Sequence, residues 1–240
     1  MIHGDIASYQ ETSGQDPFTL QNKKLLKVFL HYGPIKARVG SMVAYQGDAK
    51  FTPLGAGGAG KWLKSKLTGE GVPLMEVSGA GEVFFADMAS DIVVLYIDND
   101  TVSVNGANVL AFSGSIDHDI QRVGAGSGGI GAVAGMAAGG LYNTVLRGTG
   151  YVAVTCKGEP VILDVAQAPT FADANAVVCW TGGVQMGIKT DVTMRDFIGK
   201  GSGEAFQMAF SGTGWVMVQP AENVAQGGGQ AAGSKGFLGM

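Results

Sequence analysis

The densest group of side chains that could do chemistry is the triplet Asp117, His118 and Asp119. Imidazole and carboxylate groups bind metal ions and transfer protons, so the triplet is a candidate metal or acid–base site. In a strand, Asp117 and Asp119 would share one face with His118 on the other, and the three would converge only at a bulge. We therefore expect a solvated turn here. The sequence predicts no catalytic residue and no metal site, and the triplet is kept only as a set of candidate ligands.

A glycine-rich segment at residues 55–61 has the spacing of a nucleotide-binding loop. Gly55, Gly57 and Gly60 match GxGxxG, and Lys61 follows them. A phosphate-binding loop needs Ser or Thr after the lysine to reach the metal, but this chain has Trp62 there. The surrounding chain also lacks the alternation of strands and helices that such loops require. We interpret the segment as a glycine hinge before a helix, and we predict no cofactor.

The two cysteines, Cys156 and Cys179, lie in alternating apolar segments without CxxC or other metal-like spacing. Cys179 stands where a repeated motif described below has Ala44 and Ala111, which indicates a small core residue. We expect both to be buried free thiols and infer a reducing, cytoplasmic environment.

An aromatic motif that occurs three times indicates how the chain is organised. It consists of two apolar residues, a small one, an aromatic one, a polar one and glycine, at residues 42–47, 109–114 and 177–182. The aromatic residues Tyr45, Phe112 and Trp180 are 67 and 68 residues apart. Such regular spacing favours one β unit used three times.

A Gly-x-Gly motif alternates with the aromatic motif, at residues 78–86, 147–155 and 211–219. Apolar residues then alternate, as Val83 and Phe85 do in the first copy. This pattern predicts half-buried strands entered through tight glycine turns.

These motifs predict an all-β fold of three internal repeats with pseudo-threefold symmetry, similar to a β-prism or barrel, in one domain spanning residues 1–221. The first repeat then lacks its leading half and the last its trailing half. We therefore expect the strand near 206–219 to pack beside the N-terminal strands near 26–46 and close a ring.

The connecting segments have different compositions. Trp62, Leu63 and Leu67 share helical spacing, which predicts one short helix near 61–67. Residues 124–140 are almost all glycine and alanine and fit either a loop or a helix. Their Gly131, Gly135 and Gly139, together with Trp62, are candidates for contact with a membrane surface or another subunit. Residues 222–240 are a low-complexity tail that we expect to be mobile.

The charge of the chain disfavours some partners. Sixteen basic and twenty acidic residues give a formal charge of -4, which makes nucleic acid an unfavourable partner. The sequence has no export signal at its start and no apolar stretch of membrane-spanning length. We expect no integral membrane segment, although peripheral membrane contact stays open.

Three segments, FLHYGPIKARVGSMVAYQG, LTGEGVPLMEVSGAGEVFFA and GKGSGEAFQMAFSGTGWVMVQP, resemble the altered-inheritance-of-mitochondria twenty-four family. The resemblance spans roughly residues 25–220. It implies a β fold classed with the tryptophan RNA-binding attenuator proteins and a homo-oligomer, often a trimer. It supplies no catalytic residues.

The leading hypothesis for function is a noncatalytic oligomeric scaffold or binding module. A second hypothesis is a small-ligand-binding or enzymatic β domain, with a pocket at the repeat axis or a subunit interface that gathers Asp117, His118 and Glu82. A third is a protein that associates peripherally with membranes through residues 124–140 and Trp62.

Overall fold

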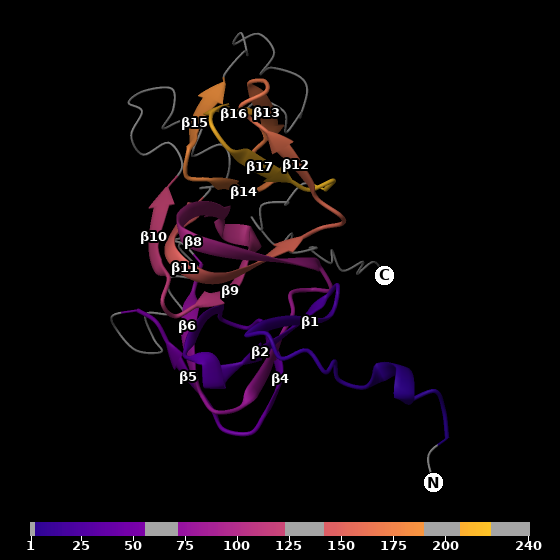
Figure 1. Ribbon diagram of the computed structural model, residues 1–240. Helices are drawn as coiled ribbons and strands as arrows, with labels where there is room; N and C mark the ends of the chain where they lie inside the picture. The colour runs from indigo at the N-terminus through magenta and orange to yellow at the C-terminus, as the bar shows by residue number, and fades with distance from the viewer. Residues whose placement is uncertain (1–2, 56–71, 123–141, 190–206, 222–240) are drawn as a thin grey trace, which may run out of the picture.

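Antiparallel strands, most of them four to six residues long, make up most of the regular structure of the described residues (Figure 1). The computed structural model describes residues 3–55, 72–122, 142–189 and 207–221. Within these residues the only helices are three single turns, η1 (Ala7–Tyr9), η2 (Leu30–Tyr32) and η3 (Gly106–Asn108). The predicted all-β class is therefore confirmed. The predicted helix near 61–67 and the tail at 222–240 lie outside the described residues.

After β1 (Phe18–Asn22), the remaining strands fall into three sets that follow one another along the chain. The first set holds β2 (Leu25–Phe29), β3 (Ile35–Arg38), β4 (Met42–Gln46), β5 (Ala49–Pro53), β6 (Leu74–Gly79) and β7 (Glu82–Phe85). The second holds β8 (Asp91–Asn105), β9 (Val109–Ser113), β10 (Asp117–Arg122) and β11 (Tyr142–Cys156). The third holds β12 (Val161–Asp164), β13 (Thr170–Asp173), β14 (Val177–Thr181), β15 (Val184–Lys189), β16 (Gln207–Gly212) and β17 (Trp215–Val218).

In each set, the strand with the aromatic motif pairs with the Gly-x-Gly strand of the same set. β4 pairs with β7, β9 with β11 and β14 with β17, all antiparallel. In each pair, one residue of the aromatic motif strand has no partner in the Gly-x-Gly strand, which makes a β-bulge. The aromatic residue always lies opposite the first valine after the glycines, in the pairs Tyr45↔Val83, Phe112↔Val152 and Trp180↔Val216. The regular spacing of the two motifs in the sequence therefore corresponds to one pattern of strand pairing that occurs three times. The pseudo-threefold symmetry of the three sets stays a prediction.

The second glycine of each Gly-x-Gly motif lies against the end of the aromatic motif strand. A Cβ atom at Gly81 would lie 2.2 Å from the carbonyl oxygen of Gln46, and one at Gly214 would lie 2.0 Å from Oγ1 of Thr181. Gly214 also has φ +130°, which L side chains rarely adopt. Glycine is therefore required for the two strands of a pair to approach each other.

Three clusters of buried apolar side chains form the core, and each follows the alternation of its strands. Phe85 is fully buried in the first cluster and Phe112 in the second, while Trp180 and Phe210 pack in the third with ring centroids 5.5 Å apart. The apolar faces predicted from the Gly-x-Gly strands are thus the faces that build the core.

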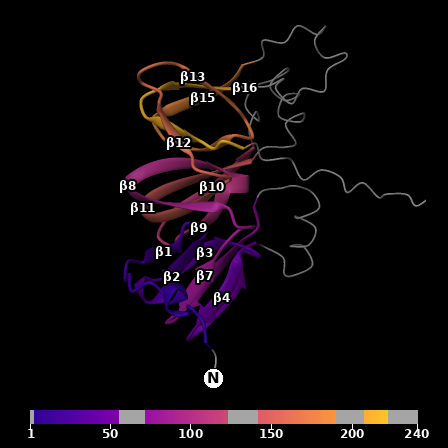
Figure 2. The same cartoon turned by 90° about the vertical axis from the view of Figure 1, so that its right-hand side faces the viewer.

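The predicted closure of the ring is wrong. β17 pairs with β12 and β14, and β16 pairs with β13 and β15, so neither strand joins the N-terminal strands. Figures 1 and 2 place the third set at the opposite end of the molecule from β2 and β4. The reason is that each aromatic motif strand pairs with the Gly-x-Gly strand that follows it in its own set, so the last Gly-x-Gly strand pairs with β14 and not with the N-terminal strands. No set is incomplete, and the sheets of the described residues stay open.

Candidate binding cleft

The triplet Asp117, His118 and Asp119 lies in strand β10 and not in the predicted turn. β10 pairs with β11, with His118 opposite Leu146. The imidazole packs 5.6 Å from the ring of Phe112, while both aspartates are exposed. Burial lowers the pKa of His118, the charge of Lys36 lowers it further, and the two aspartates oppose this shift. The regular pairing of β10 thus keeps His118 on the face opposite the two carboxylates.

Glu82 lies in another part of the fold, on β7. Its carboxylate is 3.0 Å from Nζ of Lys27, which is also 3.2 Å from Glu11. Burial by itself lowers the pKa of Lys27, but the hydrogen bonds and charges of Glu82 and Glu11 outweigh it and raise the pKa overall. Glu82 thus neutralises a buried lysine. Across the part of the chain that the structure describes, no three His, Cys, Asp or Glu side chains could hold one metal ion.

Both cysteines are buried free thiols within the second core cluster, as predicted. Burial raises the pKa of Cys156 to about 12, and it also raises the pKa of Cys179. The pairing of Cys179 opposite Met217 corresponds to that of Ala111 opposite Ala153. The interpretation as small core residues is confirmed by this burial.

The other candidates from the sequence lie where the structure gives no description. Gly55 is described, but Gly57, Gly60 and Lys61 lie outside the described residues, as do Trp62, Gly131, Gly135 and Gly139. The predictions for these residues stay predictions.

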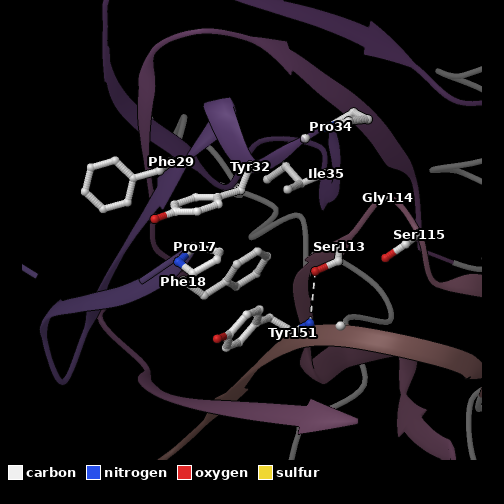
Figure 3. Close-up of a pocket in the computed structure, with 12 residues that line it drawn as sticks. Pro17, Phe18, Phe29, Tyr32, Pro34, Ile35, Ser113, Gly114, Ser115 and Tyr151 are labelled. Carbon is white, nitrogen blue, oxygen red and sulfur yellow. Dashed lines mark hydrogen bonds between the residues drawn. The ribbon is translucent and has the colours of Figure 1, made fainter. Parts of the chain in front are cut away.

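An aromatic cleft lies where the first two sets of strands meet. It has a volume of about 310 Å³. From the first set and β1 it is lined by Pro17, Phe18, Phe29, Tyr32, Gly33, Pro34 and Ile35, and from the second by Ser113, Gly114, Ser115, Gly150 and Tyr151. Figure 3 shows the rings of Phe18, Tyr32 and Tyr151 gathered on one side. No charged side chain is among these lining residues.

Ring contacts fix the wall of the cleft. Phe18 on β1 stacks on Tyr151 of β11, with centroids 5.6 Å apart and planes 11° apart. Offset stacking of this kind is favourable beyond the burial of apolar area. Tyr32 is 56% exposed, and its hydroxyl donates a hydrogen bond to the carbonyl oxygen of Gln15 at 2.9 Å. The ring of His31 also lies 4.0 Å from the ring of Tyr32, centroid to centroid. Tyr32 is therefore held in place while more than half of its surface stays exposed.

Glycines and serines form the opposite wall. A Cβ at Gly114 would lie 2.5 Å from the carbonyl oxygen of Pro34, so the two turns can approach only without a side chain there. The backbone N–H of Tyr151 donates to Oγ of Ser113 at 2.9 Å, and Oγ of Ser115 donates to the carbonyl oxygen of Thr149 at 3.0 Å. These bonds orient the hydroxyls at the edge of the cleft. The cleft combines apolar rings with a few hydrogen-bonding groups.

Sequence reasoning did not identify this cleft, although two of its elements belong to the motifs. Ser113 and Gly114 end the second aromatic motif, and Gly150 and Tyr151 belong to the second Gly-x-Gly motif. The missing information was the position of β1 and of the turn at residues 32–34 beside these motifs. The clustering of aromatic and proline residues in Asp-Pro-Phe and His-Tyr-Gly-Pro was the available signal.

Comparison with known proteins connects this architecture to one family. A family model described as mitochondrial biogenesis AIM24 matches residues 18–221, from the first residue of β1 to just beyond β17. The chain belongs to this family. The AIM24 match covers all three sets of strands and every cleft residue except Pro17. The resemblance predicted from the sequence is therefore confirmed.

A solved structure supports the AIM24 fold. The crystal structure of a Streptococcus pyogenes protein matches with a TM-score of 0.66 at 20% identity, covering 85% of this chain and 92% of that one. At this identity the likeness concerns the fold alone. No curated protein matches the chain. Of the residues the structure describes, none belong to a helix long and apolar enough to span a membrane.

Proposed function

We propose that this AIM24-family chain is a noncatalytic binding module whose cleft binds a neutral, ring-containing small molecule. The observation that carries the proposal is the convergence of Phe18, Tyr32 and Tyr151 with two prolines on one cleft. Small-molecule sites are typically concave and lined by apolar and aromatic groups with few polar ones. The lining of this cleft fits that description.

The charge of the lining favours a neutral ligand. A charged ligand would lose hydration in the cleft without gaining a charged partner from the lining residues. A planar ring would instead pack against the half-exposed ring of Tyr32 and contact the ring of Tyr151. The hydroxyls of Ser113 and Ser115 lie at the rim, where they can fix the orientation of the ligand.

A titration with the neutral fluorescent probe N-phenylnaphthylamine tests the proposal. We expect the Tyr32→Ser variant to lose about fivefold or more in affinity because one stacking face is removed. Ser115→Trp, which fills the cleft, should weaken binding without removing any ring. Tyr32 and Ser115 are both exposed, so the fold should tolerate these changes.

The matched control is Tyr9→Ser, since Tyr9 is 84% exposed and is not among the cleft residues. Equal probe binding in all four proteins, including the unchanged one, would overturn the proposal. Native mass spectrometry of the freshly purified protein adds a second measurement, because a ligand carried through purification appears as a stoichiometric extra mass. That mass should be absent from Ser115→Trp and present in Tyr9→Ser.

We also infer that the module works as a homo-oligomer. Val43 and Tyr45 on β4 are 56% and 51% exposed, and their burial by another subunit would be favourable. The family resemblance supports a trimer and an attenuator-protein-like, pseudo-threefold arrangement. The buried thiols support a reducing, cytoplasmic location. Native mass spectrometry measures the number of subunits directly.

A further inference from the structure

Strand β2 carries a lysine between two core residues. Leu26 and Val28 belong to the first core cluster, so Lys27 points to the opposite face of its sheet. Lys27 is nevertheless only 3% exposed. Its Nζ lies 4.6 Å from the ring centroid of Phe29 and 5.9 Å from that of Phe84, within the range of cation–π contacts. The two rings therefore fix the ammonium group on this face.

Two carboxylates share the ammonium group of Lys27. Glu82 on β7 lies 3.0 Å from Nζ, and Glu11, which precedes β1, lies 3.2 Å from it. An ammonium group has three N–H donors, so it can serve both carboxylates. The other carboxylate oxygen of Glu11, Oε1, accepts a hydrogen bond from Nε2 of Gln46 on β4. Each oxygen of the Glu11 carboxylate therefore has its own donor, and both donors belong to one sheet.

These donors suit a carboxylate better than other anions. A carboxylate spreads one negative charge over two oxygens, which matches a cationic donor and a neutral donor side by side. A phosphate group carries more negative charge, and the neighbouring Glu82 would repel it more strongly. Lys27 and Gln46 therefore form a carboxylate site, which Glu11 fills in this structure.

The two carboxylates are held with different firmness. Glu82 lies on β7, which pairs with β2 on one side and with β4 on the other. Glu11 precedes the first strand, and no residue in the described range 3–16 is buried. The backbone groups that flank Glu11 are hydrogen-bonded to the side-chain amide of Gln21 at 2.8 and 2.9 Å. A segment held by a few exposed polar contacts opens at low free energy, so Glu11 can leave while the sheet stays in place.

Lys27 needs a second carboxylate when Glu11 leaves. Burial by itself disfavours the charged form of this lysine, and Glu82 and Glu11 together offset that effect. Without Glu11, the ammonium group keeps Glu82 and the two rings but loses one charge-assisted hydrogen bond. Another carboxylate in the same place would restore that bond, which gives the site its affinity for this group.

We propose that the carboxylate site of Lys27 and Gln46 binds a small carboxylate from solution, and that Glu11 occupies the site as an internal ligand. Release of Glu11 leaves both donors on the sheet, where the incoming oxygens need them. An incoming carboxylate competes with a tethered one, whose effective concentration is typically in the millimolar range. External binding is therefore weak while Glu11 is present and measurable once it is removed. The inference does not rest on the ligand proposed for the cleft.

Acetate binding to the Glu11→Ala variant tests the proposal. The substitution removes the atoms that acetate replaces, and Glu11 is exposed, so the fold should tolerate it. The backbone amide signals of Lys27 and Gln46 in proton–nitrogen correlation NMR spectra report binding at constant ionic strength. We expect a saturable shift with half-saturation at roughly 50 mM, because exposed ion pairs are weak. Acetamide, which has the same shape without the charge, should give no saturable shift at the same concentrations.

The matched control is Asp5→Ala, which removes an exposed carboxylate from the same segment and should bind no more acetate than the unchanged protein. Adding Gln46→Ala to Glu11→Ala should weaken acetate binding about threefold or more, because one oxygen loses its donor. Equal binding in the unchanged protein, equal affinity in the double variant or an equal response to acetamide would overturn the proposal. The absence of a saturable shift in Glu11→Ala would also overturn it, and Glu11 would then be only an ion-pair partner of Lys27.

Discussion

The aromatic motif occurs in two different environments in this molecule. In β9 and β14 its first four residues are buried between two neighbouring strands. Among the residues that the structure describes, β4 has one neighbouring strand, and it exposes Val43 and Tyr45. The local sequence and the bulge are alike in all three strands. The difference teaches that the motif encodes a strand and its register, while the neighbouring strand decides how much apolar surface is buried.

The largest expected effect comes from truncating the aromatic residue in both environments. Phe112→Ala should lower the free energy of unfolding by about 3–5 kcal/mol, because a fully buried ring leaves a cavity. Tyr45→Ala should cost about 1 kcal/mol in the monomer, since the main loss is its edge contact with Phe51. Urea unfolding measures both values. Equal losses would show that β4 is as buried in solution as β9.

A second comparison concerns two glycines with positive φ, Gly214 and Gly33. Gly214→Ala should cost about 2–3 kcal/mol, because the new Cβ meets Thr181 and the backbone is strained. Gly33 has φ +129° with nothing within 4 Å of a Cβ, so Gly33→Ala should cost about 1 kcal/mol from strain alone. Thermal unfolding of the two variants separates close approach from backbone conformation. Equal costs would mean that the strand pair relaxes around the added methyl group.

The small position of the motif should tolerate alanine. Cys179→Ala reproduces the residue found at Ala44 and Ala111, and we expect a loss of about 1 kcal/mol in unfolding free energy. In the native protein both thiols should react with a thiol reagent at neutral pH only as fast as the protein unfolds, because burial raises their pKa values. Fast reaction of either thiol without denaturant would contradict the described core.

The smallest effect is a pH dependence from β10. His118 packs beside Phe112 as Phe51 packs beside Tyr45, so the imidazole occupies an apolar position. Its pKa is lowered, which means that the unfolded chain takes up the proton first as pH falls below about 6.5. The free energy of unfolding should therefore decrease as the pH is lowered through this range, and it should stop decreasing once the pH is below the folded-state pKa.

The control for this pH dependence is His118→Met, which places at this position the residue found in the third set at Met186. Unfolding midpoints at several pH values between about 5 and 8 measure the slope for both proteins. The slope should be smaller in the variant. An identical slope would assign the pH dependence to other groups.

The sequence predicted more of the fold than of the site. Residue spacing located the paired strands, because alternation and glycine turns are local properties of the chain. It predicted the burial of Cys179 for the same reason. The triplet at residues 117–119 was misinterpreted as a turn because adjacent charged residues are common in turns, while its regular pairing with β11 is a contact between distant segments.

The amino-acid sequence by itself determined the all-β class and the two recurring motifs, since these depend on side-chain period and on glycines that allow close approach. Only the tertiary structure decided that each set is complete, that the ring is not closed within the described chain and that β4 and β13 end their sheets. It also decided that Phe18, Tyr32 and Tyr151 share one cleft. Pairing between distant strands depends on the shape of the whole sheet, which no short segment encodes.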